Sequence, residues 1–307
     1  MGGSLFMENG VGMWPYAAPA DTDAVAARAR RFGPLPYSSL NLSGRPVAEG
    51  PGPGVGATMA VHLDRWWEDL ERPDPFVVVE HGARGGAVAA GVLGASPACA
   101  GALRYVLVEA DPALRAIQSG RVRLEPPSLA LGPVFSARHE DAEPEVAPGR
   151  GPLATSLAEP PATAAHVVLA VGWVSTLPWD LWERRGDGWV EVRVCATPDG
   201  GLGEILVPAA PAEFDFPGVG EGWRVPAEVA AKAWLDEWLG HAGPARVAVV
   251  DRVVASTAEL VVAPGKRPHR PAIALDQLDR HRRAICRREP ALSPLWLLEW
   301  HVGSGYG

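Results

Sequence analysis

Short, continuously apolar runs that alternate with helical stretches constrain this chain more than any other feature. Four such runs lie at residues 76–79, 105–108, 166–171 and 246–250, and they are rich in β-branched residues. Strands of a parallel sheet have this pattern, because helices cover both faces and bury every side chain. Helical periodicity between the runs gives a β-α-β alternation. We therefore predict an α/β fold with a mostly parallel, doubly wound sheet.

The remaining elements are predicted from periodicity and turn residues. Helices are expected at 21–31, 57–70, 86–93, 112–118, 226–239 and 273–288, and further strands at 134–138, 259–262 and 295–302. Two strands at 189–195 and 202–208 flank Asp199-Gly-Gly201, a pattern typical of a β-hairpin. The expected organisation is a loop-rich segment at 1–50, followed by a Rossmann-like domain at 51–307. In that domain the hairpin is inserted at about 182–210.

Composition and charge narrow the function classes. The chain has 307 residues and a formal net charge of -8, which excludes a general nucleic-acid binder with a basic face. Its apolar runs are shorter than the ~18 residues that span a bilayer, and nothing before Arg28 is typical of a signal peptide. The cysteines, at positions 99, 195 and 286, are scattered without a CxxC pair, as in a reducing compartment. We expect a soluble, cytoplasmic protein with no nucleic-acid or membrane partner.

A glycine-rich turn follows the first buried run. Residues 80–86 read Glu-His-Gly-Ala-Arg-Gly-Gly, and the second run ends in Glu109. In a doubly wound sheet, ligands bind beyond the carboxyl ends of the strands, where the strand order reverses. An acid at the end of the second strand can accept hydrogen bonds from both ribose hydroxyls, although Glu109 also suits a helix-capping or surface role. The pattern favours an adenosine-containing ligand, with these candidate binding residues: Glu80, Gly82, Ala83, Arg84, Gly86 and Glu109.

The identity of the ligand depends on the acid that opens the turn. A nicotinamide dinucleotide would place its pyrophosphate there, and Glu80 would repel it. A positively charged methionyl group suits the same acid, so S-adenosylmethionine (SAM) is favoured over NAD, and an NAD-dependent oxidoreductase is the weaker alternative. Asp141 is a further candidate, as a hydrogen-bond acceptor for the adenine amine. Its neighbours His139 and Glu140 cannot all face one ion with it, so we predict a solvated loop and no metal site.

The chain resembles the MidA-type SAM-dependent methyltransferases, relatives of a mitochondrial complex I assembly factor. Residues 76–86 and 105–118 carry the resemblance, the second with strand, acid, Leu-Arg and Gln in the family's order. Leu177-Pro178, residues 182–184 and the strand at 247–251 support it. The resemblance implies a Rossmann-like methyltransferase fold, SAM as cofactor and a protein arginine as the methylated group. A protein substrate or partner follows from it.

The sequence departs from the family pattern at positions where the family binds its cofactor and its methyl acceptor. The family's turn has a central glycine where this chain has Arg84. Two orientations of this side chain are open: inward, where it occupies the cofactor's space and its charge opposes the sulfonium, or outward to solvent, which leaves the site free. The family's polar Asn-Glu-x-x-Asp-Ala-x-Pro segment corresponds to residues 171–178, Val-Gly-Trp-Val-Ser-Thr-Leu-Pro. Arg252 stands where the family usually has an aromatic residue.

These departures bear on activity. Methylation of a guanidinium needs a carboxylate that orients it and accepts its proton, and no catalytic residue of this kind is identified in the sequence. Two hypotheses remain open. One is an active SAM-dependent methyltransferase with an altered acceptor, and the other is a catalytically inactive relative that uses the fold for binding or assembly.

Overall fold

The computed structural model of the chain describes ten stretches. They are residues 11–13, 22–40, 51–132, 148–161, 165–208, 216, 218–240, 245–266, 272–278 and 284–302. The chain divides into two compact units, each assembled from separated segments. The antiparallel unit comprises Met1–Pro46, Leu177–Ala233 and Val253–Arg280, and the parallel-sheet unit comprises Val47–Thr176, Trp234–Arg252 and His281–Gly307. Each is described here by itself.

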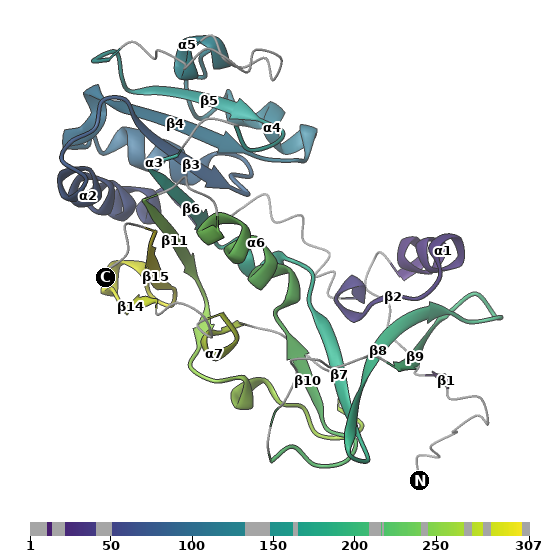
Figure 1. Cartoon of the computed structure of the whole chain (residues 1–307). Coiled ribbons are helices and arrows are strands. Elements are labelled where there is room, and N and C mark those ends of the chain that lie inside the picture. Colours follow the sequence, from purple (N-terminus) through teal and green to yellow (C-terminus); the bar gives the residue numbers. More distant parts are fainter. Residues whose placement is uncertain are drawn as a thin grey trace. The chain divides into compact units, whose positions relative to one another are not determined.

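The parallel-sheet unit is built on a seven-stranded sheet of order β14-β15-β11-β6-β3-β4-β5 (Figure 1). Its strands are β3 (Phe76–His81), β4 (Leu103–Val108), β5 (Leu153–Leu157), β6 (Val167–Val171), β11 (Arg246–Asp251), β14 (Ile285–Arg287) and β15 (Trp296–His301). The five strands from β5 to β11 are parallel, and β15 runs antiparallel to both of its neighbours. The predicted α/β class is therefore confirmed, with a large mixed sheet.

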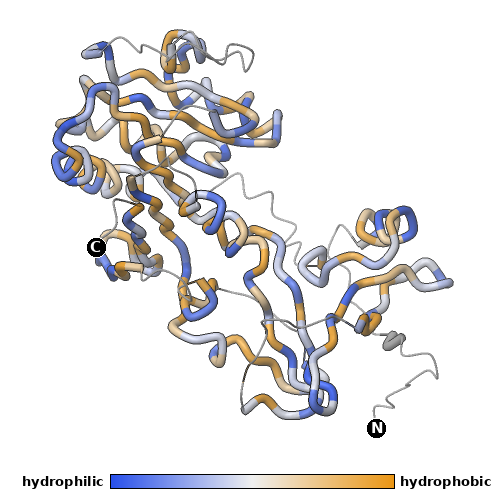
Figure 2. Tube along the Cα trace, in the orientation of Figure 1, coloured by the Kyte–Doolittle hydropathy of each residue, from blue (hydrophilic) through white to orange (hydrophobic). Residues whose placement is uncertain are grey.

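The connections of this sheet create a switch in strand order. The chain runs outward from β3 through β4 to β5, and then returns to place β6 on the other side of β3. Every residue of β3, β4, β6 and β11 is buried, as continuously apolar strands require, and Figure 2 shows hydrophobic residues along these strands. Ligands bind in such sheets at the carboxyl ends beside the switch, between β3 and β6.

Four helices follow or flank the strands of this unit. They are α2 (Pro53–Asp69), α3 (Ala87–Gly94), α4 (Pro112–Gln118) and α5 (Pro127–Leu131), and α6 (Val229–Gly240) enters the unit at Trp234. Two glycines let α2 and α3 cross at backbone contact. A Cβ on Gly56 would lie 2.2 Å from the carbonyl oxygen of Val88, and one on Gly91 would lie 2.1 Å from that of Pro53. No helix in the described part of the chain is long and apolar enough to cross a membrane.

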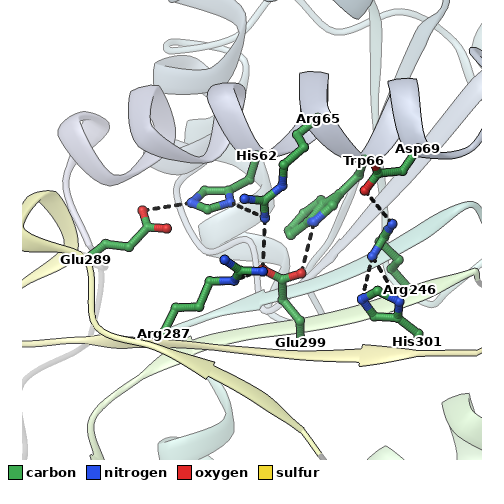
Figure 3. A network of polar contacts seen from close by, with 9 residues as sticks. All are labelled: His62, Arg65, Trp66, Asp69, Arg246, Arg287, Glu289, Glu299 and His301. Atoms are coloured by element: carbon green, nitrogen blue, oxygen red, sulfur yellow. Dashed lines mark hydrogen bonds and ion pairs between the residues drawn. The ribbon is translucent and has the colours of Figure 1, made fainter.

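A polar network fixes α2 to the β11–β15 edge of the sheet (Figure 3). The buried Glu299 carboxylate accepts hydrogen bonds from Arg65 Nη2 at 3.1 Å and from Trp66 Nε1 at 3.2 Å. Arg287 Nε lies 3.3 Å from the same carboxylate. Further contacts in the network join His62 to Glu289, and Arg246 to Asp69 and His301. The apolar side of α2, including Met59, Leu63 and Trp66, lies in the core.

The antiparallel unit contains the path β1-β9-β8-β7-β10, with β2 paired to β8. These strands are β1 (Val11–Met13), β2 (Leu35–Pro36), β7 (Asp180–Arg185), β8 (Gly188–Ala196), β9 (Leu202–Pro208) and β10 (Arg224–Ala227). The helix α1 (Thr22–Phe32) packs on β8. The hydrophobic core of this unit includes Val25, Tyr37 and Trp179. A second pair, β12 (Val253–Val254) and β13 (Ile273–Ala274), precedes the short helix α7 (Leu275–Leu278).

Several predicted elements are wrong or shifted. The strand expected at 259–262 is wrong, because Thr257–Leu260 form a 3-10 helix. Its start is capped by a Ser256–Glu259 capping box, and the prediction missed this S-x-x-E signal. The helix expected at 273–288 is instead β13, the four-residue α7 and, at Ile285–Arg287, β14, which pairs with β15. The helix expected at 226–239 begins later, because β10 takes Arg224–Ala227. The strand predicted at 134–138 lies outside the described residues.

Candidate functional site

The carboxyl end of β3 carries a buried acid. Glu80 is 2% exposed, and its Oε2 accepts a hydrogen bond from the Tyr105 hydroxyl on β4 at 2.8 Å. Burial raises the pKa of Glu80 to about 8, and the Tyr105 bond and the Arg84 charge only partly oppose it. At neutral pH the carboxyl is therefore mainly protonated. The preference for a cationic ligand was based on the negative charge of this carboxyl, and the protonated form of Glu80 lacks that charge.

The turn after β3 is held to the end of β4 by Glu109. Glu109 Oε2 accepts the backbone N–H of Arg84 at 2.9 Å, and Oε1 accepts that of Asp111 at 2.9 Å. Ala83 N–H donates to the Val108 carbonyl at 3.0 Å, and Gln118 Nε2 donates to the Arg84 carbonyl at 2.6 Å. The predicted acid thus lies directly against the predicted turn.

Arg84 keeps a glycine-like backbone but points its side chain inward. Its φ is +47°, in the left-handed region where non-glycine residues are uncommon. The residue is 8% exposed, and its Nη2 donates to the carbonyl oxygen of Gly172, which follows β6. Burial lowers the pKa of Arg84, and the charges of Asp251, Glu109 and Glu80 oppose that effect. A guanidinium therefore lies in the switch region, which is the inward one of the two orientations that the sequence left open.

Asp251 completes the set of acids at the strand ends. It is the last residue of β11 and is buried. Its Oδ2 accepts the Ser175 N–H at 2.9 Å, and its Oδ1 accepts the Arg252 N–H at 2.8 Å. Three carboxyl groups, from the ends of β3, β4 and β11, therefore act electrostatically on one guanidinium.

An aromatic cluster surrounds His81, the last residue of β3. Its ring centroid lies 5.4 Å from that of Trp173, 5.6 Å from Trp234 and 5.2 Å from Trp238. Burial lowers the pKa of His81 to about 4, so the imidazole is neutral at physiological pH. A Cβ on Gly82 would lie 1.9 Å from Trp173 Cδ1, so the indole packs directly on the turn. The cluster makes one wall beside the turn apolar and aromatic.

The structure brings together six of the seven predicted binding residues. Glu80 lies near the carboxyl end of β3, four others lie in the turn from β3 to α3, and Glu109 directly follows β4; Asp141 lies outside the described residues. Sequence reasoning did not assign Asp251, Trp173 or Gln118 to the site. Asp251 was visible as the end of a buried run, a position equivalent to that of Glu109. Gln118 was visible only as the glutamine of the family pattern at 105–118, and Trp173 carries no such signal, because tertiary packing alone brings it to the turn.

The family of the chain follows from a comparison with family models. Residues 58–240, more than half of the chain, match a family described as "Putative S-adenosyl-L-methionine-dependent methyltransferase". The chain belongs to this family. The match includes the turn after β3 and Glu109, and the cofactor predicted from the sequence, SAM, is the cofactor of the family. No curated protein matches the chain.

Two solved structures from Burkholderia thailandensis share the fold. One is the native crystal structure of an uncharacterized protein, with 21% sequence identity and a TM-score of 0.54 over 80% of this chain and 66% of that one. The other, from the same superfamily and described as a "likely methyl transferase", was crystallised bound to S-adenosyl-homocysteine. It has 19% identity and a TM-score of 0.54 over 81% of this chain and 67% of that one. This chain therefore spans about two thirds of the length of the solved structures that it matches.

The residues at the strand ends fit the adenosine part of SAM in hydrogen-bonding capacity. Each oxygen of a carboxylate offers two acceptor positions, so Glu109 retains acceptor capacity beyond its two backbone bonds. Glu80 and Asp251 supply carboxyl groups that can face a cation. The Arg84 guanidinium lies among these same acids, so the side chain and a bound cofactor would share one region.

Proposed function

We propose that this chain is a SAM-dependent methyltransferase whose cofactor binds at the carboxyl ends of β3 and β4. The observation that carries the proposal is the Glu109 carboxylate, held at the end of β4 against the turn that opens α3. Glu109 accepts the ribose hydroxyls, and the cofactor lies beside the turn that joins β3 to α3. When bound, SAM supplies a methyl group activated by a positively charged sulfur.

We extend the proposal to the acceptor, for which the resemblance to MidA-type enzymes implies a protein arginine. Orienting a guanidinium and taking up its proton require a carboxylate. Asp251 supports this role, since its Oδ2 is bonded to Ser175, in the segment where the family carries its polar acceptor-site residues. The aromatic wall formed by Trp173 is equally suited to pack against the aliphatic part of a protein side chain.

Calorimetric titration of the full chain with SAM and S-adenosyl-homocysteine (SAH) tests the cofactor site. We expect both ligands to bind, and Glu109→Gln to weaken both roughly tenfold to a hundredfold, because a charged acceptor for the ribose hydroxyls is lost. Glu159→Gln is the matched control, since Glu159 is an exposed carboxylate of the same unit. Absence of binding at millimolar ligand would overturn the proposal, provided that thermal unfolding shows the protein to be folded.

One observation favours a second candidate, a catalytically inactive binding or assembly module. The buried Arg84 guanidinium already neutralises the acids that would otherwise face the cofactor's cation. An assay of methyl transfer distinguishes the two functions. It measures tritium that passes from labelled SAM to acid-precipitable protein. Transfer that is lost in Asp251→Asn supports the enzyme. Ligand binding without transfer to any protein fraction supports the module.

A further inference from the structure

The position of Arg84 bears on which ligand the site prefers. Resting on the proposed function, we propose that Arg84 is a specificity-determining residue that makes the site favour neutral-sulfur SAH over cationic SAM. Its guanidinium supplies the positive charge that the sulfonium of SAM would otherwise supply to the neighbouring acids. The site is then best matched to the demethylated form of the cofactor.

Backbone hydrogen bonds hold Arg84 in its strained conformation. The φ of +47° is unfavourable for a side chain other than glycine. Its N–H donates to Glu109 Oε2 at 2.9 Å, and its carbonyl accepts Gln118 Nε2 at 2.6 Å. The turn is therefore anchored on both sides of the Cα, by β4 on one side and by α4 on the other. These bonds direct the side chain from the turn toward the end of β6.

The side chain is held at its far end as well. Nη2 donates to the Gly172 carbonyl, and the charges of Asp251 and Glu109 favour its charged form. A buried guanidinium is stable only when it is paired in this way, and an arginine stays protonated at all accessible pH values. His81, the neighbouring titratable group on β3, is neutral and adds no second cation. The guanidinium is therefore a permanent positive charge at the switch between β3 and β6.

A fixed cation at this place should change the relative affinities of SAM and SAH, which differ by one methyl group and by the charge on sulfur. SAM carries a positive charge on sulfur, whereas SAH carries none. In a partly buried site, two like charges within a few ångströms repel strongly enough to change affinity on the order of tenfold or more. SAH escapes this repulsion and keeps the ribose contacts of Glu109. The expected ratio of the Kd for SAM to the Kd for SAH is therefore at least about ten in the natural chain.

Titration of three Arg84 variants of the full chain with SAM and with SAH tests the proposal. Arg84→Gly restores the family's residue and should lower the ratio of the Kd values about tenfold or more, mainly by strengthening SAM binding. Arg84→Lys keeps the charge and should keep the preference for SAH. Arg84→Gln removes the charge but keeps a long polar side chain, and it decides the result if the glycine variant does not fold.

Arg72→Gly is the matched control. Arg72 also has a left-handed backbone, with φ +59°, but it is exposed and pairs with Glu68 on the surface. Its substitution removes the same charge and relieves the same strain away from the turn, so the ratio should not change.

The outcomes separate this proposal from the proposed function. A ratio that is unchanged in Arg84→Gly and Arg84→Gln, with both ligands bound, overturns the role of Arg84 and leaves the cofactor site standing. Failure of SAM and SAH to bind any folded variant overturns both. A ratio that falls in the glycine and glutamine variants, and stays in the lysine variant, supports both.

Discussion

At the scale of the residue, Glu109 serves the fold and the proposed ligand with one carboxylate. Its two oxygens accept the N–H groups of Arg84 and Asp111, and this joins the turn after β3 to the start of α4. The carboxylate keeps further acceptor positions that a ligand can use. A substitution here changes the turn together with the ligand contacts, which is why the conservative Glu109→Gln is the informative variant.

At the same scale, the raised pKa of Glu80 predicts that the stability of the fold depends on pH. Because burial raises its pKa to about 8, the folded chain holds a proton that the unfolded chain releases above about pH 4.3. The resulting stability is complete below that value and is lost as the pH rises toward 8. Glu80→Gln cannot titrate, so its Tm relative to the natural chain should rise by roughly 5 °C between about pH 5 and pH 8.

Thermal unfolding of the ligand-free chain, followed by circular dichroism, measures this effect. Glu159→Gln, an exposed carboxylate of the same unit, is expected to give a Tm difference that does not vary with pH. Parallel pH profiles for Glu80→Gln and the natural chain would show that Glu80 is ionised in the folded state. The electrostatic description of the turn would then need revision.

At the scale of the element, the helix α2 depends on a buried acid at its sheet contact. Glu299 accepts from Arg65 and from the indole N–H of Trp66 (Figure 3). Glu299→Ala leaves the buried Trp66 N–H without this acceptor and opens a cavity under α2. We expect a loss of about 3 kcal/mol in the free energy of unfolding, measured by urea denaturation.

The exposed pair Arg72–Glu68 offers the control for this prediction. Both side chains are exposed and lie four residues apart in the sequence, so Glu68→Ala should cost about 0.5 kcal/mol or less. Equal losses for Glu299→Ala and Glu68→Ala would contradict the view that the buried network, and not surface charge, fixes α2 to the sheet.

The elements also show which parts of the fold could be predicted locally. The strands β3, β4, β6 and β11 were found because burial on both faces leaves a continuous apolar run. The helix expected at 273–288 was wrong because pairing of Ile285–Arg287 with β15 outweighs local helical preference. Strand β5 was not predicted, since its Leu-Ala-Thr-Ser-Leu sequence has no continuous run of apolar residues.

At the scale of the whole molecule, each unit is assembled from segments that are far apart in the sequence. The placed members of the candidate site all belong to the parallel-sheet unit, so we expect a local response to ligand. In hydrogen exchange followed by mass spectrometry, SAH should slow exchange in peptides that cover the turn after β3 and α4. Peptides from β8 and β9 should exchange at the same rate with and without SAH. Protection confined to β8 and β9 would place the ligand elsewhere.

The amino-acid sequence by itself determined the α/β class, the order of the central strands along the chain and the turn with its acid at Glu109. These follow from local rules, since burial on both faces dictates apolar runs and a left-handed backbone in the turn favours glycine. Only the tertiary structure brings the charge of Asp251 to act on Arg84, joins the Arg84 guanidinium to the Gly172 carbonyl, and packs Trp173 on Gly82. Those contacts join the ends of different strands, and their energies depend on distances between charges and rings that no local pattern contains.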